Sequence, residues 1–183
     1  MKKTTPKKPT SLDFAILGLV SHQPLSGYGI RKIFETTEMG NFGTSPGTIY
    51  PALKRMQKLM LVENLTSKTD NKNKFHITIK GKELLQNWLV RPLEMIDVSR
   101  KREEIILRFA FMDKYSSQKQ KLVFLESFHD LLTIYIKQLL DYHKAENLQM
   151  PLHGRLSFEH GIESYKATLK WCKKTLLVIK KMT

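Results

Sequence analysis

The sequence predicts a mostly α-helical chain that contains one small β-hairpin. Apolar residues recur at helical spacing along most of its 183 residues. Two strand-like runs, residues 61–66 and 74–79, are separated by a polar segment. The second half holds few glycines and prolines, so its helices are expected to be long. We therefore expect short helices and the hairpin in the first half and long helices in the second.

The balance of charge is strongly basic. The chain has 31 Lys and Arg against 17 Asp and Glu, a formal net charge of +14, and its 41% of hydrophobic residues suffices for a packed core. This charge favours a polyanionic partner but leaves nucleic acid, an anionic membrane surface and an acidic protein open. The longest apolar run, residues 14–20, is too short to cross a bilayer, and residues 1–13 lack the apolar segment of a signal peptide. We expect a cytoplasmic protein without a membrane partner.

The first two helices are predicted from local signals. The spacing Thr10-x-x-Asp13 resembles a capping box and predicts a helix that begins at residue 11 and ends near residue 21. Residues 23–27 interrupt the helical pattern with a proline and a glycine. A second amphipathic helix is then expected over residues 27–39, because a glycine follows that can end it.

The third helix is predicted over residues 46–60. Ser45 is a good N-cap residue, and Pro46 suits the first helical position because its missing N–H has no partner there. Apolar residues recur on one face, while the opposite face carries basic and hydroxyl-bearing side chains. An amphipathic helix with such a free face fits the major groove of DNA.

A β-hairpin follows this helix, with a lysine-rich tip at residues 67–73. Three short helices followed by a hairpin is the order of a winged helix-turn-helix domain, which we place at residues 11–82. The hairpin is then the wing. The wing lysines expected to contact DNA phosphates are Lys68, Lys72 and Lys74.

Four segments within residues 12–85 resemble the PadR-like family of transcriptional regulators. They are Leu25-x-Gly27-Tyr28-x-Ile30, Ser45-Pro46-Gly47-Thr48-Ile49-Tyr50-Pro51-Ala52-Leu53-x-Arg55-Met56, Leu61-Val62-Glu63 and Ile77-Thr78-x-x-Gly81. In that family the second segment opens the DNA-recognition helix. The resemblance therefore implies DNA contacts for Ser45, Gly47, Thr48, Tyr50, Pro51 and Lys54. Arg55 occupies the family's arginine position, where it either contacts DNA or braces the domain.

The chain departs from the family pattern at two places. Met60 stands where a glycine usually precedes the wing, and a left-handed conformation there would cost about 1 kcal/mol more for methionine than for glycine. Lys74-Phe75 replaces an aromatic pair in the second wing strand. The end of the recognition helix and the wing are therefore where this chain is expected to differ from its family.

Two apolar seams run through the second half in alternating steps of three and four residues. A reversal at residues 148–154 would join them as an antiparallel helical hairpin, and residues 92–112 would supply a connecting helix. We expect residues 83–183 to form a helical, coiled-coil-like dimerisation domain, after a disordered basic arm at residues 1–10 and the winged domain at residues 11–82. The seam residues expected to mediate the dimer are Leu125, Phe128, Leu132, Tyr135, Leu139, Tyr142, Phe158, Ile162, Tyr165, Leu169, Cys172, Leu176 and Ile179.

These features predict a homodimeric regulator that binds double-stranded DNA, with residues 46–60 in the major groove and residues 67–73 on the flanking backbone or minor groove. Two-fold symmetry predicts an inverted-repeat operator, and the resemblance implies repression. The alternative is a basic coiled-coil protein that binds RNA or an acidic protein, which would leave residues 45–53 unexplained. A junction of aromatic rings could hold a small aromatic or apolar effector, or could be core packing: Trp88, Phe109, Phe111, Phe128, Tyr135 and Trp171.

The sequence argues against an enzyme, a cofactor and a metal site. Cys172 is the single cysteine, which excludes a disulfide framework and a cysteine-rich zinc site. His160-x-x-Glu163 could place two ligands on one helical face, but no further cluster of ligands completes a site. Gly27-Tyr28-Gly29 lacks the third glycine and the preceding strand of a dinucleotide motif. We expect no cofactor, no metal and no catalytic residues.

Overall fold

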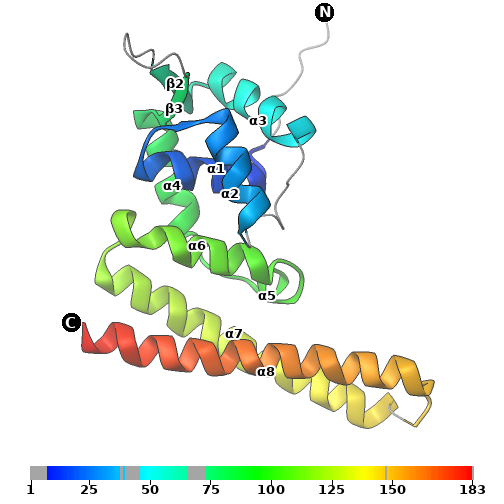
Figure 1. Cartoon of the computed structure of the whole chain (residues 1–183). Helices are drawn as coiled ribbons and strands as arrows, with labels where there is room; N and C mark the ends of the chain where they lie inside the picture. Colours follow the sequence, from blue (N-terminus) through cyan, green and yellow to red (C-terminus); the bar gives the residue numbers. More distant parts are fainter. Residues whose placement is uncertain (1–7, 38, 40–45, 66–72, 147, 183) are drawn as a thin grey trace, which may run out of the picture. The chain divides into compact units, whose positions relative to one another are not determined.

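The computed structural model describes residues 8–37, 39, 46–65, 73–146 and 148–182. The chain divides into two compact units, Met1–Trp88 and Leu89–Thr183, which Figure 1 shows in the colours of the sequence. The sequence predicts this division after residue 82, which lies within the helix Ile79–Val90. Residues 1–7 of the expected arm lie outside the described part of the chain.

The first unit combines short helices with a three-stranded antiparallel sheet in the order β1-β3-β2. In the sheet, Leu25 pairs with Phe75 and Val62 pairs with Ile77. Strand β1 was not among the predicted elements, because a strand of two residues shows no periodicity in a sequence. The elements are α1 (Ser11–His22), β1 (Leu25–Ser26), α2 (Gly27–Thr36), α3 (Pro46–Lys58), β2 (Val62–Leu65), β3 (Lys74–Ile77) and α4 (Ile79–Val90).

Helix α1 supplies much of the core of this unit. The predicted capping box is present: the Asp13 backbone N–H donates to Thr10 Oγ1 at 3.3 Å, and the Thr10 backbone N–H donates to Asp13 Oδ2 at 2.8 Å. Phe14 is buried and stacks on Trp88 of α4, with ring centroids 4.4 Å apart. Helix α1 also packs against α3 and β3, so it joins α3 to the sheet.

Helix α3 ends two residues earlier than predicted, at Lys58, because Met60 takes a left-handed conformation with φ 58°. The Leu61 N–H donates to the Met56 carbonyl and the Met60 N–H donates to the Gln57 carbonyl, both at 2.9 Å. This pair of bonds is a Schellman motif, which usually has glycine at the left-handed position.

The second wing strand also ends earlier than predicted, at Ile77, and α4 begins two residues later. Thr78 caps α4, because its Oγ1 accepts a hydrogen bond of 3.0 Å from the Gly81 N–H. A Cβ atom at Gly81 would lie 2.2 Å from the Leu61 carbonyl oxygen. Only glycine therefore lets α4 approach the start of the wing this closely.

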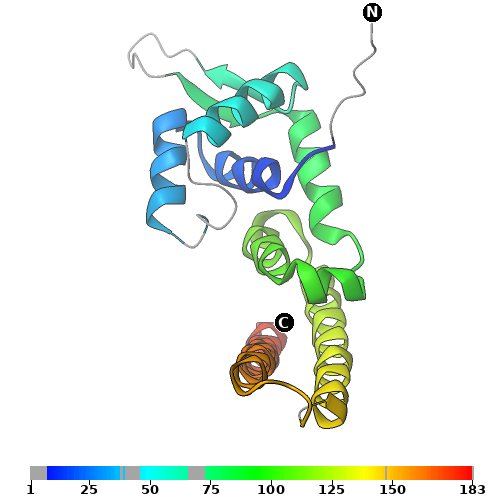
Figure 2. The same cartoon turned by 90° about the vertical axis from the view of Figure 1, so that its right-hand side faces the viewer.

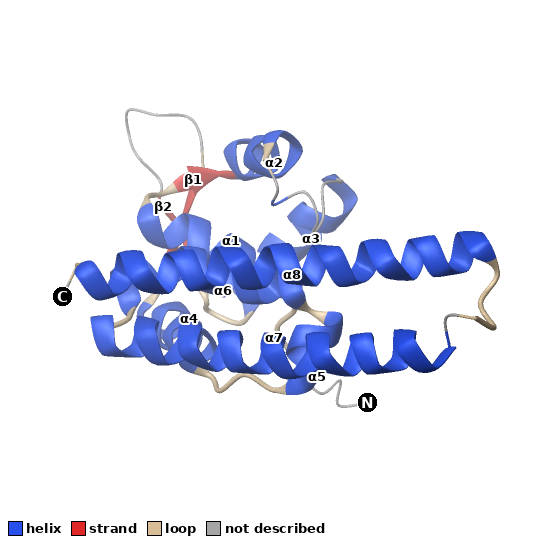
Figure 3. Ribbon diagram, turned by 90° about the horizontal axis from the view of Figure 1, so that it is seen from below, coloured by secondary structure: helices blue, strands red, loops and turns tan. Residues whose placement is uncertain are grey.

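The second unit contains helices α5 (Met95–Arg100), α6 (Arg102–Tyr115), α7 (Gln118–Glu146) and α8 (Leu152–Lys181). The prediction of a single connecting helix over residues 92–112 was wrong. Lys101 lies between α5 and α6 with a non-helical backbone, φ −136° and ψ 34°. The predicted antiparallel hairpin is present as α7 and α8, which lie side by side in Figure 3. Tyr135 meets Tyr165 edge to face across it, with ring centroids 5.0 Å apart.

The hairpin core is built from the predicted seams. Leu125, Phe128 and Leu132 of α7 are buried, as are Ile162 and Cys172 of α8. The Cys172 thiol donates to the Leu125 carbonyl at 3.4 Å, and burial raises the pKa of this thiol to about 11. The seam residues therefore pack within one chain, whatever else they contact.

Candidate nucleic-acid interface

Helix α3 has one buried and one exposed face. Ile49, Ala52, Leu53 and Met56 are almost fully buried against the rest of the first unit. Five of the predicted DNA contacts on this helix are exposed: Gly47, Thr48, Tyr50, Pro51 and Lys54. Ser45, also a predicted contact, lies outside the described residues. The exposed face brings together the hydroxyl of Thr48, the phenol of Tyr50 and the ammonium group of Lys54, which can donate hydrogen bonds to base edges and phosphates.

Tyr50 is held in place by Gly27, the first residue of α2. A Cβ atom at Gly27 would lie 2.7 Å from Tyr50 Cε1, so the absent side chain makes room for the ring. The ring nevertheless stays 46% exposed. The sequence did not identify Gly27 as the neighbour of Tyr50, since it does not reveal which side chain will pack against a glycine.

Arg55 makes a contact inside the domain. Its Nη2 donates to Asp13 Oδ1, and the Asp13 side chain is only 2% exposed. The same carboxylate closes the capping box of α1. Of the two roles left open for Arg55, the structure shows the bracing one, in which a buried carboxylate ties α3 to α1.

The wing lies beside α3, as Figure 2 shows. Lys74 pairs with Leu65 in the β2–β3 ladder and is partly buried, whereas Lys68 and Lys72 lie outside the described residues. His76 Nε2 and Glu63 Oε1 lie 2.9 Å apart across the two strands. The described base of the wing therefore offers one of the three predicted lysines.

The aromatic rings proposed as an effector site are engaged in packing within each unit. Trp88 stacks on Phe14, and Phe109 meets Trp171 edge to face with centroids 5.7 Å apart. Phe111 and Phe128 are buried. These contacts favour the alternative interpretation of the rings as core packing.

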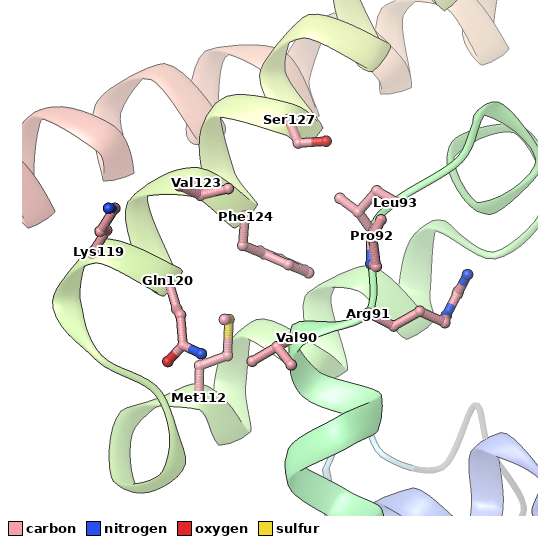
Figure 4. Close-up of a pocket in the computed structure, with 10 residues that line it drawn as sticks. All are labelled: Val90, Arg91, Pro92, Leu93, Met112, Lys119, Gln120, Val123, Phe124 and Ser127. Atoms are coloured by element: carbon pink, nitrogen blue, oxygen red, sulfur yellow. The ribbon is translucent and has the colours of Figure 1, made fainter.

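A separate pocket of about 280 Å³ lies in the second unit (Figure 4), between the start of that unit and α7. Phe124, Met112 and Val123 give it an apolar lining, to which Gln120 and Ser127 add polar groups. Arg91 and Lys119 also border it, and the charged end of Arg91 points away from Phe124 in Figure 4. This lining suits a small, mainly apolar molecule.

Arg108 contacts Phe124, one of the residues that line this pocket. Its side chain is 1% exposed, and its Nη2 donates to the Leu89 carbonyl at 2.9 Å and to the Arg91 carbonyl. Its guanidinium also lies 4.9 Å from the centre of the Phe124 ring. Burial and the neighbouring charge of Arg91 lower the pKa of Arg108 to about 10, so it stays protonated near pH 7.

Two further findings concern the described residues only. They contain no group of three or more His, Cys, Asp or Glu side chains that could hold a metal ion. They also contain no helix with the length and apolar character needed to span a membrane.

Residues 16–87, which include α3 and the base of the wing, match the model of the transcriptional regulator PadR-like family. The match covers 72 of the chain's 183 residues, so this part of the chain is similar to the PadR-like family. Among curated proteins, the negative transcriptional regulator PadR of Bacillus subtilis (strain 168) is 27% identical over 182 residues, which cover 93% of this chain and 98% of that protein.

Solved structures of the same relative are also similar to this chain. Bacillus subtilis PadR in complex with operator DNA is 23% identical, with a TM-score of 0.41, over 93% of this chain and 99% of that one. Bacillus subtilis PadR in complex with p-coumaric acid gives the same identity and coverage with a TM-score of 0.42.

Proposed function

We propose that this PadR-like regulator is a sequence-specific, DNA-binding repressor that acts as a homodimer on an inverted-repeat operator. One observation carries the proposal: α3 buries four apolar side chains and leaves Gly47, Thr48, Tyr50, Pro51 and Lys54 exposed on a single helix. A helix of this kind can enter the major groove while Lys74 and the wing tip contact the backbone. The name of the Bacillus subtilis relative, a negative regulator, supports repression.

Each DNA-contacting residue has a distinct proposed task. Thr48 and Tyr50 read base edges, while Lys54 and Lys74 bind phosphates together with Ser45, Lys68 and Lys72. Gly47 and Pro51 let the helix backbone approach the groove. Arg55 acts as a brace, because Asp13 already engages its guanidinium.

The test is selection of bound molecules from a random duplex-DNA pool at near-physiological salt. Wild-type protein should enrich an inverted repeat whose half-sites lie about 34 Å or a multiple apart. Tyr50→Ala should abolish the enrichment, because it removes an exposed ring of the recognition helix. Tyr115→Ala, the same truncation in the second unit, should leave it unchanged. Binding without any enriched sequence, or equal affinity for RNA and duplex DNA, would support the basic coiled-coil alternative.

The dimer is proposed to form through the second unit. Four apolar side chains near the turn between α7 and α8 are half or more exposed: Tyr142 55%, Leu148 91%, Leu152 57% and Leu156 50%. Among the exposed apolar residues of α8, Leu177 and Val178 stand between lysines, whose charges would repel a second copy. We therefore assign the dimer contact to these four residues, Tyr142, Leu148, Leu152 and Leu156, which we call the turn end. Tyr142 also belongs to the predicted seam of α7.

A small apolar or aromatic effector is proposed to bind the pocket around Phe124 and Met112. This region links the start of the second unit to α7, so occupancy could change the preferred arrangement of the dimer. Val123→Trp would fill the pocket from an exposed position and should abolish release of operator DNA by an effector found in a ligand screen. The proposal assigns no enzymatic activity to the chain and places it in the cytoplasm, together with its DNA.

A further inference from the structure

Helix α8 carries a dense row of lysines that has no part in the DNA contacts proposed for α3. Six of the residues from 166 to 181 are lysines, and none is acidic. In the heptad register of the buried seam, with Ile162 at position a, these lysines occupy positions e, b and f, which adjoin one another around a helix. We call this set the lysine face: Lys166, Lys170, Lys173, Lys174, Lys180 and Lys181.

The lysine face is exposed and only partly neutralised. Lys166 pairs with Glu163 at 2.8 Å, and Lys180 pairs with Glu126 of α7 at 3.0 Å. Within the described residues, the other four lysines have no carboxylate within ion-pair distance. Lysines three and four residues apart repel each other along a helix, so an anionic partner would relieve a cost that the free protein bears.

The dimensions of the face suit the backbone of duplex DNA. Fifteen steps of 1.5 Å separate its first and last lysines, a length of about 22 Å, while each DNA strand presents one phosphate per about 3.4 Å of helix axis. Several lysines can therefore meet phosphates at once. The face contains no aromatic side chain that could stack on a base, so its contacts would not depend on sequence.

Two other occupants fit the face less well. Insertion into a lipid surface requires a continuous apolar side of the helix. In α8 Ile162 and Cys172 are buried, and between residues 166 and 181 only Leu177 and Val178 are large apolar residues that stay exposed. A second copy of the same face would bring like charges together. An acidic protein would need a matching linear array of carboxylates, whereas every DNA duplex provides a regular array of phosphates.

We propose that the lysine face is a second DNA-binding surface, which holds the phosphate backbone of duplex DNA without reading its sequence. This second surface depends on the proposed function only because both take duplex DNA as the partner. When these lysines neutralise phosphates, counterions are released from the DNA, which strengthens binding to any duplex, and α3 alone supplies the preference between sequences.

The experiment compares two triple variants of the full-length chain. The first, K170Q/K173Q/K174Q, removes unpaired lysines of the face. The control, K114Q/K137Q/K144Q, removes three exposed lysines of α6 and α7 and changes the net charge equally. Far-ultraviolet circular dichroism checks that both are folded. Binding to a random-sequence duplex of about three helical turns, roughly 31 base pairs, is measured by fluorescence anisotropy over a range of salt concentrations.

The lysine-face variant should bind this duplex at least about tenfold more weakly at 0.1 M salt, and the slope of log K against log salt should fall by about 1 for each lysine that meets a phosphate. The control should keep the wild-type slope. Equal losses in both variants would overturn the proposal, because net charge alone would then explain them. Unchanged duplex binding by the lysine-face variant would also overturn it, and lost binding to polyglutamate or to vesicles of equal parts phosphatidylserine and phosphatidylcholine would then identify the actual partner.

The same variants separate this proposal from the proposed function. If the selection enriches no sequence but the lysine-face variant still loses duplex affinity, specific regulation fails and the second surface stands. If the variant keeps wild-type affinity while an inverted repeat is enriched, the regulator stands and the second surface fails.

Discussion

Met60 carries a backbone strain that a single substitution can remove. Its φ of 58° is reached easily by glycine but costs an L-residue about 1 kcal/mol. The side chain is 65% exposed, so its loss sacrifices little apolar burial. Met60→Gly should therefore raise the free energy of unfolding by about 1 kcal/mol, as measured by urea denaturation.

Lys58, two residues earlier, provides the matched control. It is exposed and lies in the last turn of α3, where helical φ gives glycine no advantage. Lys58→Gly should lower the free energy of unfolding by up to about 1 kcal/mol, because glycine loses more backbone entropy on folding than lysine does. Destabilisation by both substitutions would show that the Met60 side chain contributes packing that outweighs its strain.

At the scale of elements, Asp97 fixes the segment between α4 and α6. Burial by itself would raise the pKa of Asp97, but hydrogen bonds from Arg91 Nη2 at 2.9 Å and from the Glu94 N–H at 3.1 Å outweigh it and lower the pKa. A carboxyl with a lowered folded-state pKa stabilises the fold above its unfolded pKa of about 3.9, and this stabilisation is lost as the pH falls through the folded value. Asp97→Asn should lower the free energy of unfolding by about 2 kcal/mol near pH 7. This value lies between those of surface and buried ion pairs, because Asp97 is 3% exposed and Arg91 is 38% exposed.

The pH dependence distinguishes this origin from a packing defect. Urea unfolding of both proteins from pH 7 to pH 3 should show the difference between wild type and Asp97→Asn shrinking below about pH 4. A difference that stays constant over this range would mean that the variant disturbs packing and that the charge contributes nothing.

The elements differ in how far the sequence predicts them. The capping box at Thr10 and Asp13, the recognition helix and the long hairpin were predictable, because caps and helical periodicity are local signals. Strand β1 and the break at Lys101 were not, since both depend on partners distant in sequence. The same holds for the interface: the sequence indicates which residues of α3 are polar, but only the fold shows that Asp13 engages Arg55.

At the scale of the whole molecule, the seam residues limit how two copies can associate. An a/d seam in a sequence needs a partner helix but does not specify whether that helix belongs to the same chain. In this chain five seam residues of α7 and α8 are already buried within the second unit: Leu125, Phe128, Leu132, Ile162 and Cys172. A dimer that exchanged these contacts would gain little apolar burial, so the proposed dimer must use apolar surface that the hairpin leaves exposed.

The proposed dimer contact at the turn end predicts which substitution separates the copies. L152E/L156E places two charges where apolar surface would be desolvated in the dimer, so the variant should sediment as a monomer of 21.3 kDa while wild type sediments at twice that mass. Leu177→Glu is the control: this leucine is 64% exposed on α8 but lies among lysines, so the variant should remain a dimer. Because two half-sites bound by one dimer reinforce each other, the monomeric variant should also lose affinity for an inverted repeat while keeping that for an isolated half-site. A dimeric L152E/L156E protein would place the contact elsewhere on the second unit.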